Sequence, residues 1–432
     1  MTTVQKISSQ AGGSEAPAHT KTLSVNGRDY RYPRQPVVVI CYDGCDQRYI
    51  DAAIAQSIIP NMQRMMEHGF AGSSLATMPT FTNPNNVSIV CGAPPSVHGV
   101  SGNYYLDRET RREVMMLDAT LLRAPTILSS FSHQGAQVVA ITAKDKLRKV
   151  LGHEMLGIAF SAQHADTCTL EENGIENVEE LVGRPAPMQY DADLSLFVLD
   201  AGVRLLETRG FGLAYLSLSD YVQHAHAPGT PEANAFMAAV DVRLGRLAEL
   251  GAIVGIVADH GMSDMADADG APKILYLGDA LDETFGKGAT RVICPITDPF
   301  VRHHGALGGF VRVHFMQDGL DAASVLDFIA SRDGVALALP GPIAAQRFDL
   351  PADREADIVV IAERGVALGA GTQDHDLSQL AGTRLRSHGG LEEQPVPFIV
   401  SHSLSDAYAE RAKAQPLHNF DIFDFVLNGV EV

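Results

Sequence analysis

Three carboxylates and three imidazoles in this sequence have the types and spacing of metal ligands: Asp43, Asp220, His224, Asp259, His260 and His388. Asp220 and His224 lie four residues apart, which places them on one face of a helix. Asp259 and His260 are adjacent, and the glycines after His388 allow close approach of the backbone. A nitrogen and oxygen ligand set without cysteine favours catalytic zinc over manganese or iron.

The segment MPTFTNPNNVSIV, residues 78–90, contains a candidate nucleophile, Thr82. A neutral threonine hydroxyl is a weak nucleophile, but metal coordination lowers its pKa. Two metals about 3.5–4 Å apart that share this oxygen could clamp an in-line displacement at phosphorus. The proline and asparagines predict a tight turn before a helix whose N-terminus favours an anion. The alternative is a structural loop with Thr82 as an N-cap.

These residues need a scaffold, and five apolar segments predict its strands: 36–44, 135–143, 210–220, 251–262 and 396–402. Helical patterns lie between them, for example at 193–210. This alternation predicts a doubly wound α/β core with a mostly parallel sheet. Functional residues of such sheets lie beyond the carboxyl ends of the strands. Four of the predicted strands end at candidate residues: Asp43, Lys144, Asp220 and Asp259-His260.

Residues 263–370 differ in pattern from the rest of the chain. They contain short strand patterns (KILYLG, GGFVRVHF and DIVVIAE), one helical pattern (AASVLDFIASRDG) and many turn residues. We therefore expect an inserted α+β cap at 263–370 and a catalytic core formed by 23–262 and 371–432. Residues 1–22 are rich in small residues, which predicts a flexible arm.

The overall composition restricts the class of partner. The chain has 432 residues, is 46% hydrophobic and carries a formal charge of −19, which repels nucleic acid and anionic lipid. We therefore expect a small-molecule substrate, with neither nucleic acid nor membrane as a partner. The N-terminus lacks the apolar segment of a secretion signal, and five scattered cysteines suggest reduced thiols. Both observations favour a cytoplasmic location, and the sequence leaves a monomer and a homodimer open.

The ordered set of motifs resembles the alkaline phosphatase superfamily, and more narrowly its nucleotide pyrophosphatase/phosphodiesterase-like branch. The motifs are Asp43, PTFTNPNN with Thr82, CGAPPSVHG, Asp220 with His224, Asp259-His260-Gly261-Met262, and His388-Gly389. The resemblance implies an alkaline-phosphatase-like core with two zinc ions. It assigns one zinc to Asp43, Thr82, Asp259 and His260, and the other to Asp220, His224 and His388. Sulfatases of this superfamily carry Cys/Ser-x-Pro-x-Arg, a pattern that is not found around Thr82.

Two further segments, SGNYYLD and TAKDK, indicate a branch member that acts on phosphonoacetate. The resemblance places Asn103 against a phosphoryl oxygen. Lys144 and Lys146 lie two apart at a strand end, so their side chains point the same way and can hold a substrate carboxylate. Cleavage of a C–P bond leaves a carbanion whose charge spreads into that carboxylate. The lysines would stabilise charge that develops in the transition state.

The expected reaction is hydrolysis of phosphonoacetate to acetate and phosphate through a phosphothreonine at Thr82. One alternative is a phosphodiesterase or nucleotide pyrophosphatase with the same metals. Such an enzyme would need an aromatic slot for a base and would not depend on Lys144 and Lys146. A second alternative is a metal-loaded binding protein without turnover.

Overall fold

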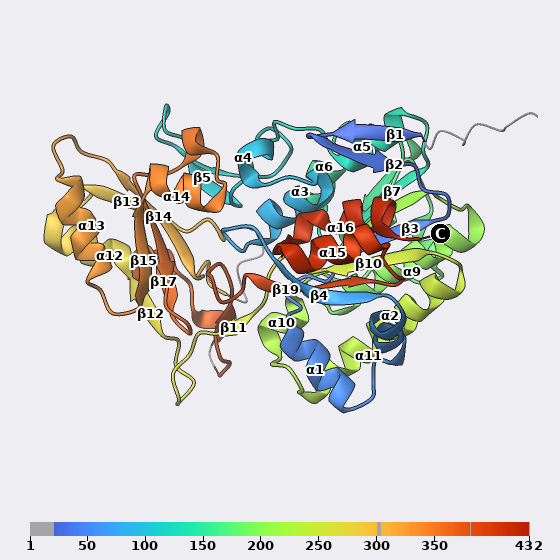
Figure 1. The fold of residues 1–432 in the computed structure, drawn as a ribbon. Helices are drawn as coiled ribbons and strands as arrows, with labels where there is room; N and C mark the ends of the chain where they lie inside the picture. Colours follow the sequence, from blue (N-terminus) through green and yellow to red (C-terminus); the bar gives the residue numbers. More distant parts are fainter. Residues whose placement is uncertain (1–20, 300–303, 381, 432) are drawn as a thin grey trace, which may run out of the picture.

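The computed structural model describes residues 21–299, 304–380 and 382–431. It consists of a large α/β core and a smaller part formed by residues near 275–370, drawn in yellow and orange in Figure 1. Residues 1–20 of the predicted arm lie outside the described residues. The described chain begins with a hairpin of β1 (Thr22–Val25) and β2 (Arg28–Arg31).

The core contains an eight-stranded sheet with the order β20-β4-β19-β10-β3-β9-β7-β8. Only β19 runs antiparallel to its neighbours, β10 and β4, and the other pairs are parallel. The predicted mostly parallel α/β core is therefore confirmed. The strands are β3 (Val37–Cys41), β4 (Phe70–Leu75), β7 (Val138–Thr142), β8 (Ile158–Ser161), β9 (Leu213–Ser217), β10 (Ile253–Val257), β19 (Pro395–Val400) and β20 (Leu417–His418).

Helices cover both faces of this sheet, because alternate residues of its buried strands point to opposite sides. Val38 and Ile40 of β3 belong to the apolar cluster under one set of helices: α1 (Gln47–Ala55), α2 (Pro60–His68), α9 (Asp193–Thr208) and α11 (Pro231–Glu249). Val37 and Val39 belong to the cluster under the other set: α3 (Thr82–Cys91), α5 (Ile127–His133), α6 (Asp145–Leu151) and α16 (Ile422–Asp424).

The smaller part is built on a four-stranded antiparallel sheet, β13 (Thr290–Ile293), β14 (Phe310–Phe315), β16 (Ile358–Ala362) and β15 (Val335–Pro340) in spatial order. Its helices are α12 (Leu277–Phe285), α13 (Ala322–Ala330) and α14 (Gly341–Phe348). Its apolar cluster also contains Met78 and Phe81, which precede the candidate nucleophile. This subdomain is therefore packed directly against the candidate site. Its limits at 263 and 370 remain a prediction.

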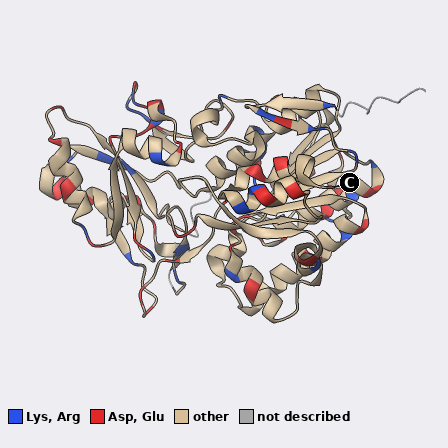
Figure 2. Cartoon of the chain, viewed as in Figure 1, with Lys and Arg blue, Asp and Glu red and all other residues tan. Residues whose placement is uncertain are grey.

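Short elements complete the chain. They are α4 (Pro95–His98), β5 (Tyr104–Leu106), β6 (Glu113–Met115), α7 (Leu170–Asn173), α8 (Val178–Val182), α10 (Tyr221–Ala225), β11 (Ser263–Asp264), β12 (Ile274–Tyr276), β17 (Ala367–Gly369), β18 (Arg386–Ser387) and α15 (Asp406–Ala414). Basic positions are scattered among acidic ones over both parts of the chain (Figure 2). Among the described helices, none has the length and apolar character needed to cross a bilayer.

Candidate active site

Four adjacent parallel strands, β10, β3, β9 and β7, end at the same edge of the sheet. Asp43 follows β3, Asp220 follows β9, and Asp259 with His260 follows β10. All four side chains are buried. Parallel pairing thus gathers residues that lie far apart in the sequence, as the strand pattern predicted.

Thr82 is the first residue of α3, and the Asn-Pro-Asn-Asn residues after it lie within the helix. The predicted tight turn before a helix is therefore wrong at this point. Proline is tolerated in a first helical turn because the backbone N–H groups there have no intrahelical acceptor. Oγ1 of Thr82 lies 3.3 Å from Nε2 of His260. The hydroxyl therefore sits beside a candidate ligand, at the positive end of a helix.

The neighbouring asparagines organise this end of α3, a role that sequence reasoning missed. The side chain of Asn85 accepts from the backbone N–H of Thr77 (2.7 Å) and donates to the Thr77 carbonyl (3.0 Å). Asn86 donates to Oδ2 of Asp259 (3.1 Å) and to the Thr82 carbonyl (3.0 Å). Asn86 therefore couples the helix that carries the candidate nucleophile to a candidate ligand. The NPNN run is the signal for this role in the sequence, although its composition favours a turn.

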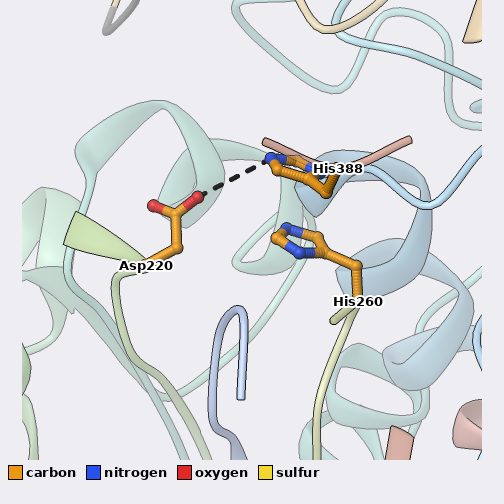
Figure 3. Close-up of side chains that lie close together, drawn as sticks. All are labelled: Asp220, His260 and His388. Carbon is orange, nitrogen blue, oxygen red and sulfur yellow. Dashed lines mark ion pairs between the residues drawn. The ribbon is translucent and has the colours of Figure 1, made fainter. Parts of the chain in front are cut away.

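The candidate ligands form two overlapping groups whose ligand atoms lie within 4.8 Å of one another: Asp43, Asp259 and His260, and Asp220, His260 and His388. Nε2 of His260 lies 3.3 Å from Asp43 Oδ1 and 3.7 Å from Asp259 Oδ2. Figure 3 shows Asp220 facing His388, with 3.8 Å between Oδ2 and Nε2. The ring centroids of His260 and His388 lie 3.5 Å apart in a stacked arrangement, and His260 belongs to both groups.

His224 joins the second group through Asp220, since its Nε2 lies 2.9 Å from Oδ2 of that carboxylate. All three candidate histidines direct Nδ1 at a backbone carbonyl. The acceptors are Arg386 for His224 (2.7 Å), Gly261 for His260 (2.9 Å) and Thr80 for His388 (2.8 Å). A carbonyl on Nδ1 fixes the tautomer that leaves Nε2 as a metal ligand.

The electrostatics of the site favour bound cations. Burial, followed by the nearby Asp220 and Asp259 carboxylates, raises the pKa of Asp43 well above its ordinary value. Burial likewise raises the pKa of Asp259 to about 7. Within the described chain neither Asp43 oxygen has a hydrogen-bond partner of good geometry. A cluster of buried carboxylates with incomplete hydrogen bonding is costly unless a cation compensates its charge, so this donor set fits divalent metals.

Lys144 and Lys146 extend toward the candidate metal ligands, but they lie at the start of a helix and not on a strand. Strand β7 ends at Thr142, Lys144 is the N-cap of α6, and Lys146 lies in its first turn. The expectation that both lie on one face of a strand is therefore wrong. Lys144 Nζ lies 3.2 Å from Asp220 Oδ1, and Lys146 Nζ lies 3.3 Å from Asp298 Oδ2. Both ammonium groups are nevertheless directed toward the candidate site.

Asn103 is also buried, next to the inserted subdomain. Its Nδ2 donates to the carbonyl of Ile296 at 3.3 Å. Ile296 shares an apolar cluster with Phe81, the residue before Thr82. Among the described residues nothing donates a hydrogen bond to Oδ1 of Asn103. A buried amide oxygen normally has a partner, so this side chain is a candidate for contact with a ligand.

Sequence reasoning missed Asp298 as the partner of Lys146 and gave no role to His304. His304 is buried, and its ring stacks on that of His224 with the centroids 5.4 Å apart. Burial, with the nearby His224, lowers the pKa of His304 to about 3, so its imidazole is neutral. His303 lies outside the described residues. No sequence pattern predicts the contact of Asp298 with Lys146 or that of His304 with His224, because each depends on how the inserted subdomain packs on the core.

Comparisons with known proteins identify the family of this chain. A family model described as type I phosphodiesterase / nucleotide pyrophosphatase matches residues 37–390. The chain belongs to this family, and the predicted membership is confirmed. An uncharacterised pyrophosphatase/phosphodiesterase of Schizosaccharomyces pombe is 24% identical over 247 residues, which are 54% of this chain and 45% of that protein. The chain therefore spans less than half the length of that curated relative.

Solved structures give a closer match. The chain is similar to phosphonoacetate hydrolase from Sinorhizobium meliloti 1021, with 44% identity, a TM-score of 0.91, and coverage of 95% of this chain and 99% of that one. That enzyme has been solved in complex with phosphonoformate and with phosphonoacetate. Murine ectonucleotide pyrophosphatase/phosphodiesterase 5 is 15% identical with a TM-score of 0.60, covering 92% of this chain and 96% of that one, and shares the fold.

Asn86 offers a test of the metal site outside its ligands. We expect Asn86→Ala to lower the zinc affinity by ~10–100-fold, because loss of a group that orients a ligand has effects of this size. Zinc competition titration with a chromogenic chelator would measure this affinity. Asn428→Ala is the control, since Asn428 bonds to Asp29 and Asp424 instead. Equal affinity in all three proteins would contradict the coupling of Asn86 to Asp259.

Proposed function

We propose that this protein hydrolyses the C–P bond of phosphonoacetate to acetate and phosphate, with Thr82 as the nucleophile. The observation that carries this proposal is the placement of two lysines, the partly buried Lys144 and the buried Lys146, at the edge of the sheet that holds the candidate metal ligands. The similarity to a phosphonoacetate hydrolase over nearly the whole chain supports the same substrate.

Two divalent cations fit the donor set described above, and we propose zinc for both. We assign one to Asp43, Thr82, Asp259 and His260, and the other to Asp220, His224 and His388. When bound, such ions supply Lewis-acid stabilisation of phosphoryl oxygen charge and lower the pKa of the Thr82 hydroxyl. The stacked position of His260 and His388 is consistent with two closely spaced ions.

The residues of this chain then have separate roles in the reaction. The Thr82 oxygen attacks phosphorus, the P–C bond breaks, and its electron pair passes to carbon and spreads into the carboxylate. Lys144 and Lys146 bind that carboxylate and stabilise the added charge, while Asn103 holds a phosphoryl oxygen. Protonation of the carbon gives acetate, and water hydrolyses the phosphothreonine to release phosphate.

Substrate preference tests this proposal most directly. We expect zinc-loaded protein to release phosphate from phosphonoacetate and to cleave a p-nitrophenyl phosphodiester far more slowly. Removal of the Lys146 ammonium should lower kcat/KM for phosphonoacetate by ~10²-fold or more, since a buried charge contact is lost. Phosphate release by Lys146→Ala and Lys144→Ala/Lys146→Ala would measure this. Lys149→Ala is the matched control, because Lys149 lies on the same helix but is exposed.

The possible results separate the candidate functions. Preference for the diester, with no effect of the lysines, would reassign the protein as a phosphodiesterase of the same family. Bound zinc without phosphoryl transfer from either substrate would indicate a binding protein.

The location and assembly of the protein stay predictions. All five cysteines are free thiols in the structure, which suits the cytoplasmic location that we propose. Size-exclusion chromatography with light scattering would distinguish a monomer from a homodimer.

A further inference from the structure

Arg312 in β14 is a buried charge of the inserted subdomain, with 2% of its surface exposed. It forms a two-pronged ion pair with Glu355, from Nε to Oε1 at 2.5 Å and from Nη2 to Oε2 at 2.9 Å. Glu355 is 1% exposed. A buried ion pair of this kind often adds little to stability compared with apolar residues of similar volume. Its contribution to stability alone therefore does not explain why Arg312 and Glu355 are placed here.

The remaining guanidinium nitrogen of Arg312 forms a hydrogen bond with the segment that carries Asn103. Nη1 of Arg312 donates to the carbonyl of Ser101 at 3.0 Å, two residues before Asn103. The backbone N–H of Asn103 donates to the carbonyl of Pro295 at 2.8 Å. The segment that contains Pro295 follows β13, and β13 pairs with β14 with Ile293 opposite Arg312. The inserted subdomain therefore holds the backbone at Ser101 and at the N–H of Asn103 itself.

Other arginines join the inserted subdomain to the core at residues that lie farther from Asn103 in the sequence than Ser101 does. Arg354 donates to the carbonyls of Gly99 (2.6 Å) and Leu121 (2.7 Å). Arg123 pairs with Asp353, and both side chains are partly exposed. These contacts attach the subdomain to the core whether or not Arg312 is present. What Arg312 adds is a directed, charge-assisted hydrogen bond beside the candidate phosphoryl-binding amide.

We propose that Arg312 is a positioning residue, which fixes Asn103 for phosphoryl binding through the Ser101 carbonyl and is itself oriented by Glu355. This inference rests on the proposed function of Asn103. Small displacements of a positioned group can cost large factors in rate, so a residue that touches no substrate can limit catalysis. In this arrangement part of the active-site geometry is set by the inserted subdomain.

A double-mutant cycle tests the inference. Arg312→Lys keeps the charge opposite Glu355 but loses the planar fork that reaches Ser101. We expect it to lower kcat/KM for phosphonoacetate by ~10-fold or more, as misplacement of a catalytic contact does. Asn103→Ala alone should cost ~10²-fold or more, the effect of losing a transition-state hydrogen bond. In the Asn103→Ala background, Arg312→Lys should have almost no further effect.

Each departure from this result has a different meaning. If the two losses multiply in the double variant, Arg312 does not act through Asn103 and the inference is overturned. If Asn103→Ala is fully active, the proposed role of Asn103 fails first, and the inference falls with it. Arg123→Gln, which breaks an ion pair between the same two parts away from Asn103, should keep wild-type kcat/KM.

Thermal melting and zinc content must be compared for all variants. If Arg312→Lys does not fold, Glu355→Gln takes its place in the cycle, because glutamine keeps one acceptor for the guanidinium. It should show the same dependence on Asn103, with a smaller loss of kcat/KM. A loss from Glu355→Gln that is equal with and without Asn103 would count against the inference in the same way.

Discussion

Thr82→Ala should abolish turnover of phosphonoacetate while both metal sites still bind zinc. The other ligands remain, and their histidine tautomers are fixed by backbone carbonyls that this substitution does not alter. Removing a nucleophile of this kind costs a factor of at least ~10⁴ in kcat. Phosphate release would measure the loss, and elemental analysis would measure the zinc.

Thr82→Ser is the matched control for this result, because serine keeps the hydroxyl at the start of α3. We expect activity within ~10-fold of wild type, since the nucleophilic oxygen is kept and its activation is unchanged. Samples of wild type that are quenched with acid during turnover of phosphonoacetate should contain a covalent phosphoryl group that Thr82→Ala lacks. Retained turnover in Thr82→Ala with wild-type zinc content would rule out the covalent mechanism.

The clustering of the candidate ligands Asp43, Asp220, Asp259 and His260 could be foreseen from the sequence because it depends on strand ends. An apolar strand that stops at Asp43, or at Asp259-His260, identifies the edge where parallel neighbours place their side chains. The observed strand order β10-β3-β9-β7 brings these ends together. Predicting that these four candidate residues meet therefore needed only local patterns and one topological rule. The assignment of individual ligands to the two metals remains a prediction.

The supporting contacts could not be foreseen, because they join segments that the sequence pattern does not relate. Asn86 reaches Asp259 across 173 positions, and Arg312 reaches Ser101 across 211. The two lysines illustrate the same limit. Their convergence was expected for a strand end, whereas the structure achieves it with the first turn of a helix and a partner, Asp298, from the inserted subdomain. Such contacts are fixed by packing between distant elements.

Removal of zinc should destabilise the protein as well as inactivate it. Asp43, Asp220 and Asp259 are all buried within one site, and their mutual repulsion opposes folding unless cations are bound. Ligand that binds only the folded chain adds about 4 kcal/mol to the free energy of unfolding at a thousandfold excess over Kd. We expect chelation by EDTA to abolish phosphate release and to lower Tm, with both restored by added zinc.

The size of this destabilisation should depend on pH in a defined direction. Burial raises the pKa of Asp259 to about 7 from an ordinary value of 3.8, so the folded metal-free chain binds more protons than the unfolded chain between these values. Its free energy of unfolding therefore falls as pH rises from about 4 to 7. Zinc binding requires the ionised carboxylate, so the zinc-loaded protein should not show this fall. Melting curves with zinc and with EDTA should thus diverge as pH rises from 5 to 7. Asp259→Asn removes this titrating group and should flatten the pH dependence of the EDTA-treated protein. A constant difference in Tm across this pH range would contradict the metal-compensated carboxylate site.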